Sequence, residues 1–404
     1  MASCDCLVLG AGASGLMAAW QAAKVGASVI LADKADKAGV KVLVSGGGRG
    51  NVTNLTVDAS WYIGEHPEFC RHVLRRFGSH AALDMLRTLR IPLEEREAGQ
   101  VFCLSPASKL VEALLEQGVR SGVNLRLRRE VAALEQQGRT LVAHLEHPDG
   151  VEAIRAGSVV LALGSPAWPQ LGASDQGHRL AGALGHRIVP VRPVLSPFVM
   201  PQSWPLQGLS GVSVPVRVSV GGRRFDRDLL FTHKGVSGPA ALLASCFWRG
   251  GAELRIDFMP SQQIQALMHD PDLGRLLVRT LVQRHMPDRL AERLIPEDLR
   301  NRKVAEIGKR DRLCLTACIH EHTVIPTRVE GLGKAEAAAG GVDTGEIDAK
   351  SLESRLVPGL FFCGEVMDVT GLLGGYNLHW AWASGKTAGE TAARYALRGR
   401  ENRP

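Results

Sequence analysis

The chain has 404 residues, 45% of them hydrophobic, which is enough for a sizeable core spread over two or three structural units. Its 48 Lys and Arg residues against 41 Asp and Glu residues leave a formal net charge of +7. No run approaches the ~18 consecutive apolar residues of a membrane span, and the eight scattered cysteines do not form the pattern of a disulfide framework.

The positive charge allows two interpretations, because basic residues gather in the segments 71–76, 126–129 and 303–312. They form ordinary solvated surface, or they contact a phosphate-rich partner such as RNA. The beginning of the sequence has neither a basic segment nor a cleavable apolar stretch, so we expect a protein that is not secreted. With the scattered cysteines, this predicts a cytoplasmic protein without a membrane partner.

The beginning of the chain has the order of a nucleotide-binding unit. The apolar run Cys4–Leu9 is typical of a strand buried on both faces, and the sequence GAGASG follows it at 10–15. Small residues along Ser14–Lys24 predict a helix packed closely on a sheet, and Ala27–Ala32 predicts a second strand that ends at Asp33. This order predicts a Rossmann unit that binds a dinucleotide.

Each glycine of this fingerprint has a physical task. Gly10 makes the tight turn, Gly12 lets a pyrophosphate approach the helix start, and Gly15 allows close packing of helix on strand. Asp33 is placed to accept hydrogen bonds from ribose hydroxyls, and the following lysine does not distinguish NAD from NADP. The position at the beginning of the chain favours FAD. The predicted cofactor-binding residues here are Gly10, Gly12, Ala13, Ser14, Gly15, Asp33 and Lys34.

A second glycine-rich segment, Ser45–Asn54, reads SGGGRGNVTN. Three successive glycines let backbone N–H groups close on a phosphate, and an arginine can fork onto its oxygens. The alternative is a flexible linker, but linkers rarely carry an arginine and two asparagines so close together. The predicted cofactor-binding residues here are Lys41, Ser45, Gly46, Gly47, Gly48, Arg49 and Asn51.

The end of the chain contributes the other half of the predicted cofactor site. Leu360–Gly364 is an apolar strand followed by an acid, and a pair of glycines precedes a helix at about Leu378–Leu397. The N-terminus of such a helix stabilises the negative charge of a reduced flavin. The alternative is a helix merely capped by an asparagine. Ser158–Leu163 predicts a third strand that ends at the cofactor. The predicted residues are Gly164, Gly364, Glu365, Gly374, Gly375, Tyr376 and Asn377.

The middle of the chain has a different character. Alternating residues in Pro193–Met259 predict antiparallel strands, and Ser261–Arg300 has helix-period apolar positions. Arg312–Val329 is predicted to return to strand, with His320 and His322 on one face of it. A metal site there is disfavoured, because no third ligand is evident. We therefore predict no metal.

These observations predict an α/β fold in which both chain ends build one FAD-binding Rossmann-type domain of the two-dinucleotide-binding flavoprotein kind. An inserted β-rich domain carries a helical subdomain. The predicted boundaries are 1–192 and 330–404 for the discontinuous FAD domain, 193–260 and 301–329 for the β-domain, and 261–300 for the helical subdomain.

Five motifs together resemble the BaiN/RdsA-like (YhiN-like) NAD(P)/FAD-dependent oxidoreductase family, over essentially the whole chain. They are GAGASG (10–15), SGGGRGNVTN (45–54), LALGSPAWPQLG (161–172), LLFTHKGVSGPA (229–240) and GLFFCGEVMDVTGLLGGYNLHWAWASG (359–385). Two departures place the chain on a divergent branch. Gly50 stands where the family's loop usually has cysteine, and Asp33 replaces the more common glutamate.

The resemblance implies an FAD enzyme reduced by a transient NAD(P)H, which passes hydride to an activated C=C bond of a small molecule. Reduction of uridine in ribosomal RNA is the first alternative, and a non-catalytic flavin-binding module is the second. An oxidase that O2 reoxidises is a further possibility. The candidate proton donors are Tyr376, His379 and Asp368, with His233 as an outside candidate.

Overall fold

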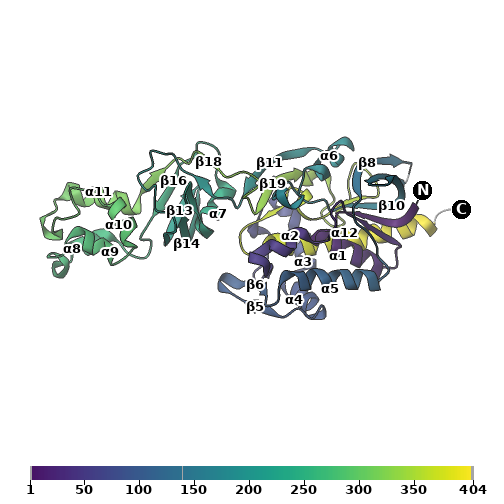
Figure 1. The fold of residues 1–404 in the computed structure, drawn as a ribbon, viewed down its shortest axis with the longest axis horizontal. Helices are drawn as coiled ribbons and strands as arrows, with labels where there is room; N and C mark the ends of the chain where they lie inside the picture. Colours follow the sequence, from purple (N-terminus) through teal and green to yellow (C-terminus); the bar gives the residue numbers. More distant parts are fainter. Residues whose placement is uncertain (1, 139, 402–404) are drawn as a thin grey trace. The chain divides into compact units, whose positions relative to one another are not determined.

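The structure is a computed structural model that describes residues 2–138 and 140–401. Within this part the chain forms two compact units (Figure 1). The first contains the residues up to Arg192 together with those from Ala337 onward, and the second is Pro193–Glu336. None of the described helices combines the length and apolar character needed to cross a membrane.

A parallel sheet forms the centre of the first unit, because its strands are apolar on both faces. β1 (Ala2–Leu9) pairs with β2 (Val29–Ala32) on one side and with β10 (Gly150–Leu161) on the other. β7 (Asn124–Arg126) extends the sheet beyond β2, and β20 (Leu360–Phe362) pairs with the end of β10. The strands predicted from both ends of the sequence are thus confirmed, and they belong to one sheet.

Antiparallel strands complete this unit. β8 (Glu130–Gln137) and β9 (Thr140–His147) continue the main sheet from the first part of β10. The remaining described strands of the unit form three smaller sheets. One contains β3 (Asn51–Asn54), β6 (Gln100–Cys103) and β5 (Leu93–Glu95). The second pairs β4 (Tyr62–Ile63) with β21 (Thr370–Gly371), and the third pairs β11 (Ile188–Val194) with β19 (Ala337–Val342).

Two helices from opposite ends of the chain pack tightly against each other. α1 (Ala13–Lys24) follows β1, and α12 (Tyr376–Glu401) ends the described chain. A Cβ atom at Gly385 or Gly389 of α12 would lie 2.4 or 2.2 Å from backbone oxygens of α1. Glycine at these two positions therefore lets the helix backbones touch, which joins the two halves of the discontinuous unit.

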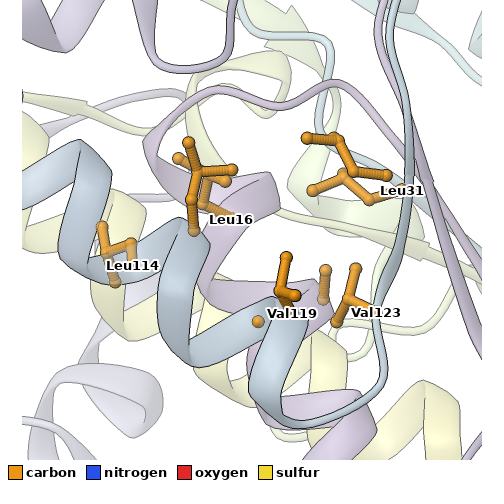
Figure 2. Close-up of a pocket in the computed structure, with 9 residues that line it drawn as sticks. Leu16, Leu31, Leu114, Val119 and Val123 are labelled. Atoms are coloured by element: carbon orange, nitrogen blue, oxygen red, sulfur yellow. The ribbon is translucent and has the colours of Figure 1, made fainter.

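α5 (Ala107–Arg120) packs beside α1 on the main sheet, and Figure 2 shows a small apolar cavity at this contact. Its volume is about 10 Å³, and Leu16, Leu31, Leu114 and Val123 are among the side chains that line it. A space of about one water without polar partners is a packing gap and no ligand site. The other helices of the first unit are α2 (Val40–Val44), α3 (Arg71–Arg76), α4 (Ser79–Thr88) and α6 (Gln176–Ala183).

The second unit is built around one antiparallel sheet with an apolar face that α7 (Gly238–Phe247) covers. α7 begins with a proline in its first turn. The strands, in their order across the sheet, are β17 (His322–Val324), β16 (Leu254–Asp257), β13 (Ser213–Val220), β14 (Arg223–Phe231), β15 (Gly235–Ser237), β12 (Phe198–Val199) and β18 (Arg328–Val329).

The helical segment expected at 261–300 is present, but its helices are short because Pro271, Pro287 and Pro296 interrupt it. The strand expected over Arg312–Val329 is wrong in its first half. That half belongs to a helix, whose buried residues Leu315 and Ile319 are four positions apart. The helices are α8 (Ile264–His269), α9 (Val278–Gln283), α10 (Asp288–Leu294) and α11 (Lys309–His320).

This correction separates the two histidines that were expected on one strand face. His320 ends α11, with Nδ1 2.8 Å from Asp257 and Nε2 accepting from the backbone N–H of Ile264. His322 begins β17 and accepts a hydrogen bond from the indole of Trp204. Both side chains therefore have structural partners in the second unit.

Candidate functional site

The start of α1 has the form of an anion cradle. Gly12 precedes the helix with φ −76°, and no side chain caps the first N–H groups. A Cβ atom at Gly12 would meet no atom within 4 Å, whereas one at Gly15 would lie 1.7 Å from the Gly10 oxygen. Gly15 is therefore needed for packing, and Gly12 leaves open space before free donors. This geometry fits the pyrophosphate of a dinucleotide.

Asp33 lies beside this cradle at the end of β2. Its carboxylate accepts hydrogen bonds from the backbone N–H groups of Ala11 at 2.5 Å and Ala35 at 2.8 Å. Each carboxylate oxygen can accept a further bond, so Asp33 can still accept from a ribose hydroxyl. The Lys34 ammonium instead donates to the hydroxyl of Ser174 at 3.1 Å.

The glycine-rich loop forms a tight turn that other residues would strain. Ser45–Gly48 is a 3-10 turn in which Gly46 and Gly47 have φ values of +56° and +68°. Gly50 also has a positive φ of +63°, although a Cβ atom there would make only ordinary contacts. Backbone conformation therefore explains glycine at position 50, where the resembled family usually has cysteine. Arg49 is exposed, with a guanidinium nitrogen 3.8 Å from Glu94.

The end of this loop contacts the glycine pair near the end of the chain. The side-chain amide of Asn54 donates to the Gly374 carbonyl at 3.0 Å. A Cβ atom at Gly375 would lie 2.5 Å from the Thr53 oxygen and 2.6 Å from Asn51 Oδ1. Among the described residues, this buried oxygen of Asn51 has no hydrogen-bond donor. The glycine-rich loop and the segment before α12, which were predicted as two halves of the cofactor site, therefore meet at this amide oxygen.

A second junction brings Lys41 and Glu365 together, although 324 positions separate them. The Lys41 ammonium lies 2.6 Å from a Glu365 carboxylate oxygen, which also accepts from the Ser165 hydroxyl at 2.9 Å. Both charged side chains are partly exposed, at 34% and 19%. Gly164 and Gly364, which flank this group, have φ values of +72° and +76°. The group therefore contains charges that a ligand can still reach.

Tyr376 is the first residue of α12 and lies on the glycine pair. Its ring is 2% exposed and stacks on Trp61, with centroids 4.9 Å apart and planes 8° apart. The expected alternative of an asparagine helix cap is wrong for Asn377, whose amide bonds to both the N–H and the carbonyl of Gly371. Asn377 therefore closes the loop before the helix.

His379 is buried in the core of the first unit, with no exposed surface. Its Nδ1 lies 2.8 Å from the Thr53 hydroxyl and its Nε2 lies 2.9 Å from the Phe77 carbonyl. The carbonyl accepts only, so Nε2 carries the hydrogen and Nδ1 accepts from Thr53. Burial lowers the pKa of His379 to about 4. This arrangement is structural and does not suit a proton donor.

Asp368 is also buried, at 3% exposure, and both its oxygens accept from backbone N–H groups. Glu65 donates at 2.7 Å and Gly340 at 3.1 Å, while burial raises the pKa of the carboxyl above its ordinary value. These bonds connect the segment after β4 with β19, which again indicates a structural role. The outside candidate His233 lies exposed in the second unit, between β14 and β15.

Three side chains of this site were not predicted, namely Trp61, Thr53 and Ser165. Each of these residues lies within or near a motif that predicts cofactor binding, but its own residue type does not indicate a role in the site. Their roles depend on contacts with residues more than a hundred positions away, such as the 326 positions between Thr53 and His379.

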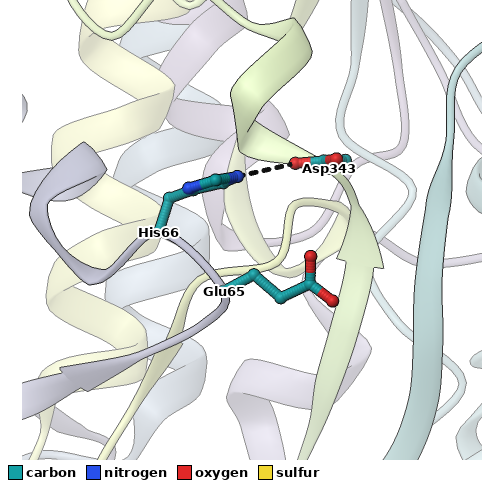
Figure 3. Close-up of side chains that lie close together, drawn as sticks. All are labelled: Glu65, His66 and Asp343. Carbon is teal, nitrogen blue, oxygen red and sulfur yellow. Dashed lines mark ion pairs between the residues drawn. The ribbon is translucent and has the colours of Figure 1, made fainter.

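Figure 3 shows three side chains of types that can bind a metal ion and that lie close together in the first unit: Glu65, His66 and Asp343. Arg187 donates to Glu65 at 2.6 Å and to Asp343 at 2.7 Å, and its pKa is raised by these two carboxylates. A guanidinium between the carboxylates repels a cation, so the group is an ion-pair network.

Comparison with known proteins agrees with this geometry. Residues 4–391 match the family described as HI0933-like protein Rossmann domain. A protein of Escherichia coli named ribosomal RNA dihydrouridine synthase is 37% identical over 94% of this chain and 96% of its own length. Its namesake in Haemophilus influenzae is 35% identical over the same shares. A 3-dehydro-bile acid delta(4,6)-reductase of Clostridium scindens is 32% identical over 96% and 98%.

Solved flavoenzyme structures share the fold. A quinol-fumarate reductase superposes with a TM-score of 0.53 at 18% identity, over 98% of this chain and 72% of its own. A 3-ketosteroid-delta4-(5alpha)-dehydrogenase of Rhodococcus jostii has a TM-score of 0.50 at 18% identity, over 97% of both chains. The chain belongs to the HI0933-like family, with relatives of the BaiN and RdsA kind, and it is an FAD-dependent oxidoreductase.

Proposed function

We propose that this protein reduces a C=C bond conjugated to a carbonyl group, and that its substrate is a uridine of ribosomal RNA. The main support for this proposal is the similarity to two relatives named ribosomal RNA dihydrouridine synthase, at 37% and 35% identity along nearly the whole chain. The sequence alone favoured a small molecule over RNA, whereas these two relatives support the RNA substrate. Formation of dihydrouridine adds two hydrogens across the C5=C6 bond of uracil.

The cradle at α1 and the junctions with the C-terminal segment carry the proposed cofactor contacts. The N–H groups after Gly12 would hold the pyrophosphate, and Asp33 would accept from a ribose hydroxyl. The Lys41–Glu365 pair and the acceptor of Asn51 would bind polar groups elsewhere on the cofactor. FAD, when bound, supplies the hydride that saturation of a C=C bond requires.

The N-terminus of α12 supports this chemistry electrostatically. The helix is 26 residues long, and no acidic residue lies in its first turn. Its partial positive charge, directly after Gly374 and Gly375, favours the negative charge that accumulates on a reduced flavin. The second carbon of the substrate needs a proton. Of the three predicted donors, we retain Tyr376, because it begins this helix directly after the glycine pair. Like the other two, its side chain is buried.

A nicotinamide is the proposed reductant, and it would bind only transiently, since the chain has a single dinucleotide fingerprint. The relative named as a bile-acid reductase supports a second candidate substrate, a small unsaturated ketone. Both substrates present a C=C bond conjugated to a carbonyl, so one cofactor site suits either. Membership of an oxidoreductase family sets the non-catalytic alternative aside.

The test is an anaerobic absorbance titration of the purified protein with NADH and with NADPH, followed by unmodified ribosomal RNA or by a conjugated steroid ketone. We expect bleaching of the flavin by a nicotinamide and its return on addition of RNA, with dihydrouridine detected by mass spectrometry of the digested RNA. Return of colour with the steroid but not with RNA would replace the first candidate by the second. Return only on admission of air would indicate an oxidase.

A further inference from the structure

A column of aromatic rings leads from the core of the first unit to its surface. Trp380 is fully buried, Tyr62 packs against it with centroids 6.2 Å apart, and Tyr376 meets Tyr62 edge-on at 6.1 Å. Trp61 is the outer end of the column and stacks in parallel on Tyr376. Trp61 is partly exposed, whereas the other three rings are buried. The column therefore presents one indole to solvent.

Backbone bonds hold Trp61 at the edge of the proposed cofactor site. Its carbonyl accepts from the N–H of Leu372 at 2.9 Å, in the loop that leads to the glycine pair. The next residue, Tyr62, pairs with Gly371 and donates its hydroxyl to the Tyr376 carbonyl at 3.0 Å. The position of the indole is thus tied to the start of α12, where the flavin edge is expected.

The Tyr376 ring covers one face of the indole, and the Trp61 side chain is partly exposed, so the opposite face and the edge are the surfaces that a ligand could contact. We propose that Trp61 is a specificity-determining residue, whose free face stacks on the flat pyrimidine ring of the RNA nucleotide to be reduced. This inference rests on the proposed function and names how the site holds its substrate. Aromatic side chains that stack on unpaired bases are the common means of holding single-stranded RNA.

Stacking also distinguishes substrate from product. The conjugated uracil ring is planar, but saturation of C5 and C6 makes both carbons tetrahedral and puckers the ring. A puckered ring loses contact with a flat indole, because dispersion attraction falls steeply when atoms leave optimal separation. Trp61 therefore favours binding of uridine and release of dihydrouridine.

The experiment compares Trp61→Phe and Trp61→Leu, since phenylalanine keeps a flat ring and leucine keeps only the apolar surface. Steady-state reduction of ribosomal RNA gives KM and kcat, and fluorescence anisotropy gives the affinity for oligouridylate and for the same oligomer made of dihydrouridine. Flavin absorbance and melting temperature check that each variant is folded and loaded. Tyr395→Leu removes a half-buried ring elsewhere on α12 and is the control.

We expect Trp61→Leu to raise the KM for RNA by about tenfold, the scale of one lost stacking contact, and to lose the preference for uridine over dihydrouridine. Trp61→Phe should retain most of both. An unchanged KM and preference in Trp61→Leu, in an enzyme that reduces RNA, overturns the inference alone. A wild-type protein that reduces no uridine in RNA overturns the proposed function, and the inference with it.

Discussion

The side-chain amide of Asn54 donates a hydrogen bond to the Gly374 carbonyl oxygen over 3.0 Å, and 320 positions separate the two residues. The same nitrogen donates to the Ala98 carbonyl, and Asn54 is only 1% exposed. The bond closes the glycine-rich loop on the segment that starts α12. It is a physical link between two motifs that the sequence shows only separately.

Replacement of Asn54 by alanine removes the side-chain donor to the buried Gly374 carbonyl and to the exposed Ala98 carbonyl, and we expect a loss of about 2 kcal/mol in the free energy of unfolding. The occupancy of FAD should fall as well, because the loop and the helix start would no longer be aligned. Chemical denaturation and the flavin-to-protein absorbance ratio measure the two effects. Thr56→Ala, which removes only an exposed donor to Asn54, is the control and should change stability by less than about 0.5 kcal/mol.

Gly12 and Gly15 form a matched pair that separates cofactor binding from folding. Gly12→Ala adds a methyl group to open space at an ordinary negative φ, so the apo-protein should keep its stability while FAD binding weakens. Gly15→Ala forces a Cβ atom into the Gly10 oxygen, and overpacking of this kind costs about 1–3 kcal/mol. Thermal unfolding of the apo-proteins with FAD titration checks both. Equal behaviour of the two variants would contradict the assigned roles.

Glu365 provides a test of the proposed cofactor contacts near the C-terminal strand. Glu365→Gln removes the charge that holds Lys41 and should weaken FAD binding by about tenfold, the scale of one charge-assisted hydrogen bond. Glu390→Gln is the matched control, because Glu390 is a similarly buried partner of Lys386 further along α12. Isothermal titration of the apo-proteins with FAD gives both affinities. A similar loss in the two variants would indicate a general effect on α12.

His379 predicts a pH dependence of stability. Burial lowers its pKa from 6.5 to about 4, so between these values the unfolded chain binds a proton that the folded chain does not. The contribution of His379 to the free energy of unfolding is therefore fully present above pH 6.5 and is lost as pH falls toward 4. The full contribution is about 3 kcal/mol.

The variant His379→Gln can keep both hydrogen bonds without a titrating group. We expect a flatter dependence of unfolding free energy on pH between 4 and 6.5 than in the wild type. The remaining slope comes from other groups, since burial also lowers the pKa of His178, His186 and His322. An unchanged slope would show that His379 does not contribute. Urea unfolding curves across this pH range measure it.

The nucleotide-binding unit and the glycine-rich turns could be predicted from the order of residues along the chain. These features depend on residues close together in the chain: an apolar strand, a glycine where a turn needs positive φ, and a helix of small residues. The same locality explains the error at α11, because the sequence of a short segment does not reveal which of its side chains the tertiary contacts will bury.

Which of the predicted residues lie together at one site, and which are buried behind it, depends on how the folded chain packs. His379 and Asp368 follow the same motif as Tyr376, yet their environments differ, because burial depends on partners such as Thr53 and Gly340 far away in the chain. Trp61 gains its importance only from stacking on Tyr376. The sequence specifies the chemical type of each side chain. The exposure, the pKa and the position of that side chain depend on contacts that form when distant segments of the chain pack together.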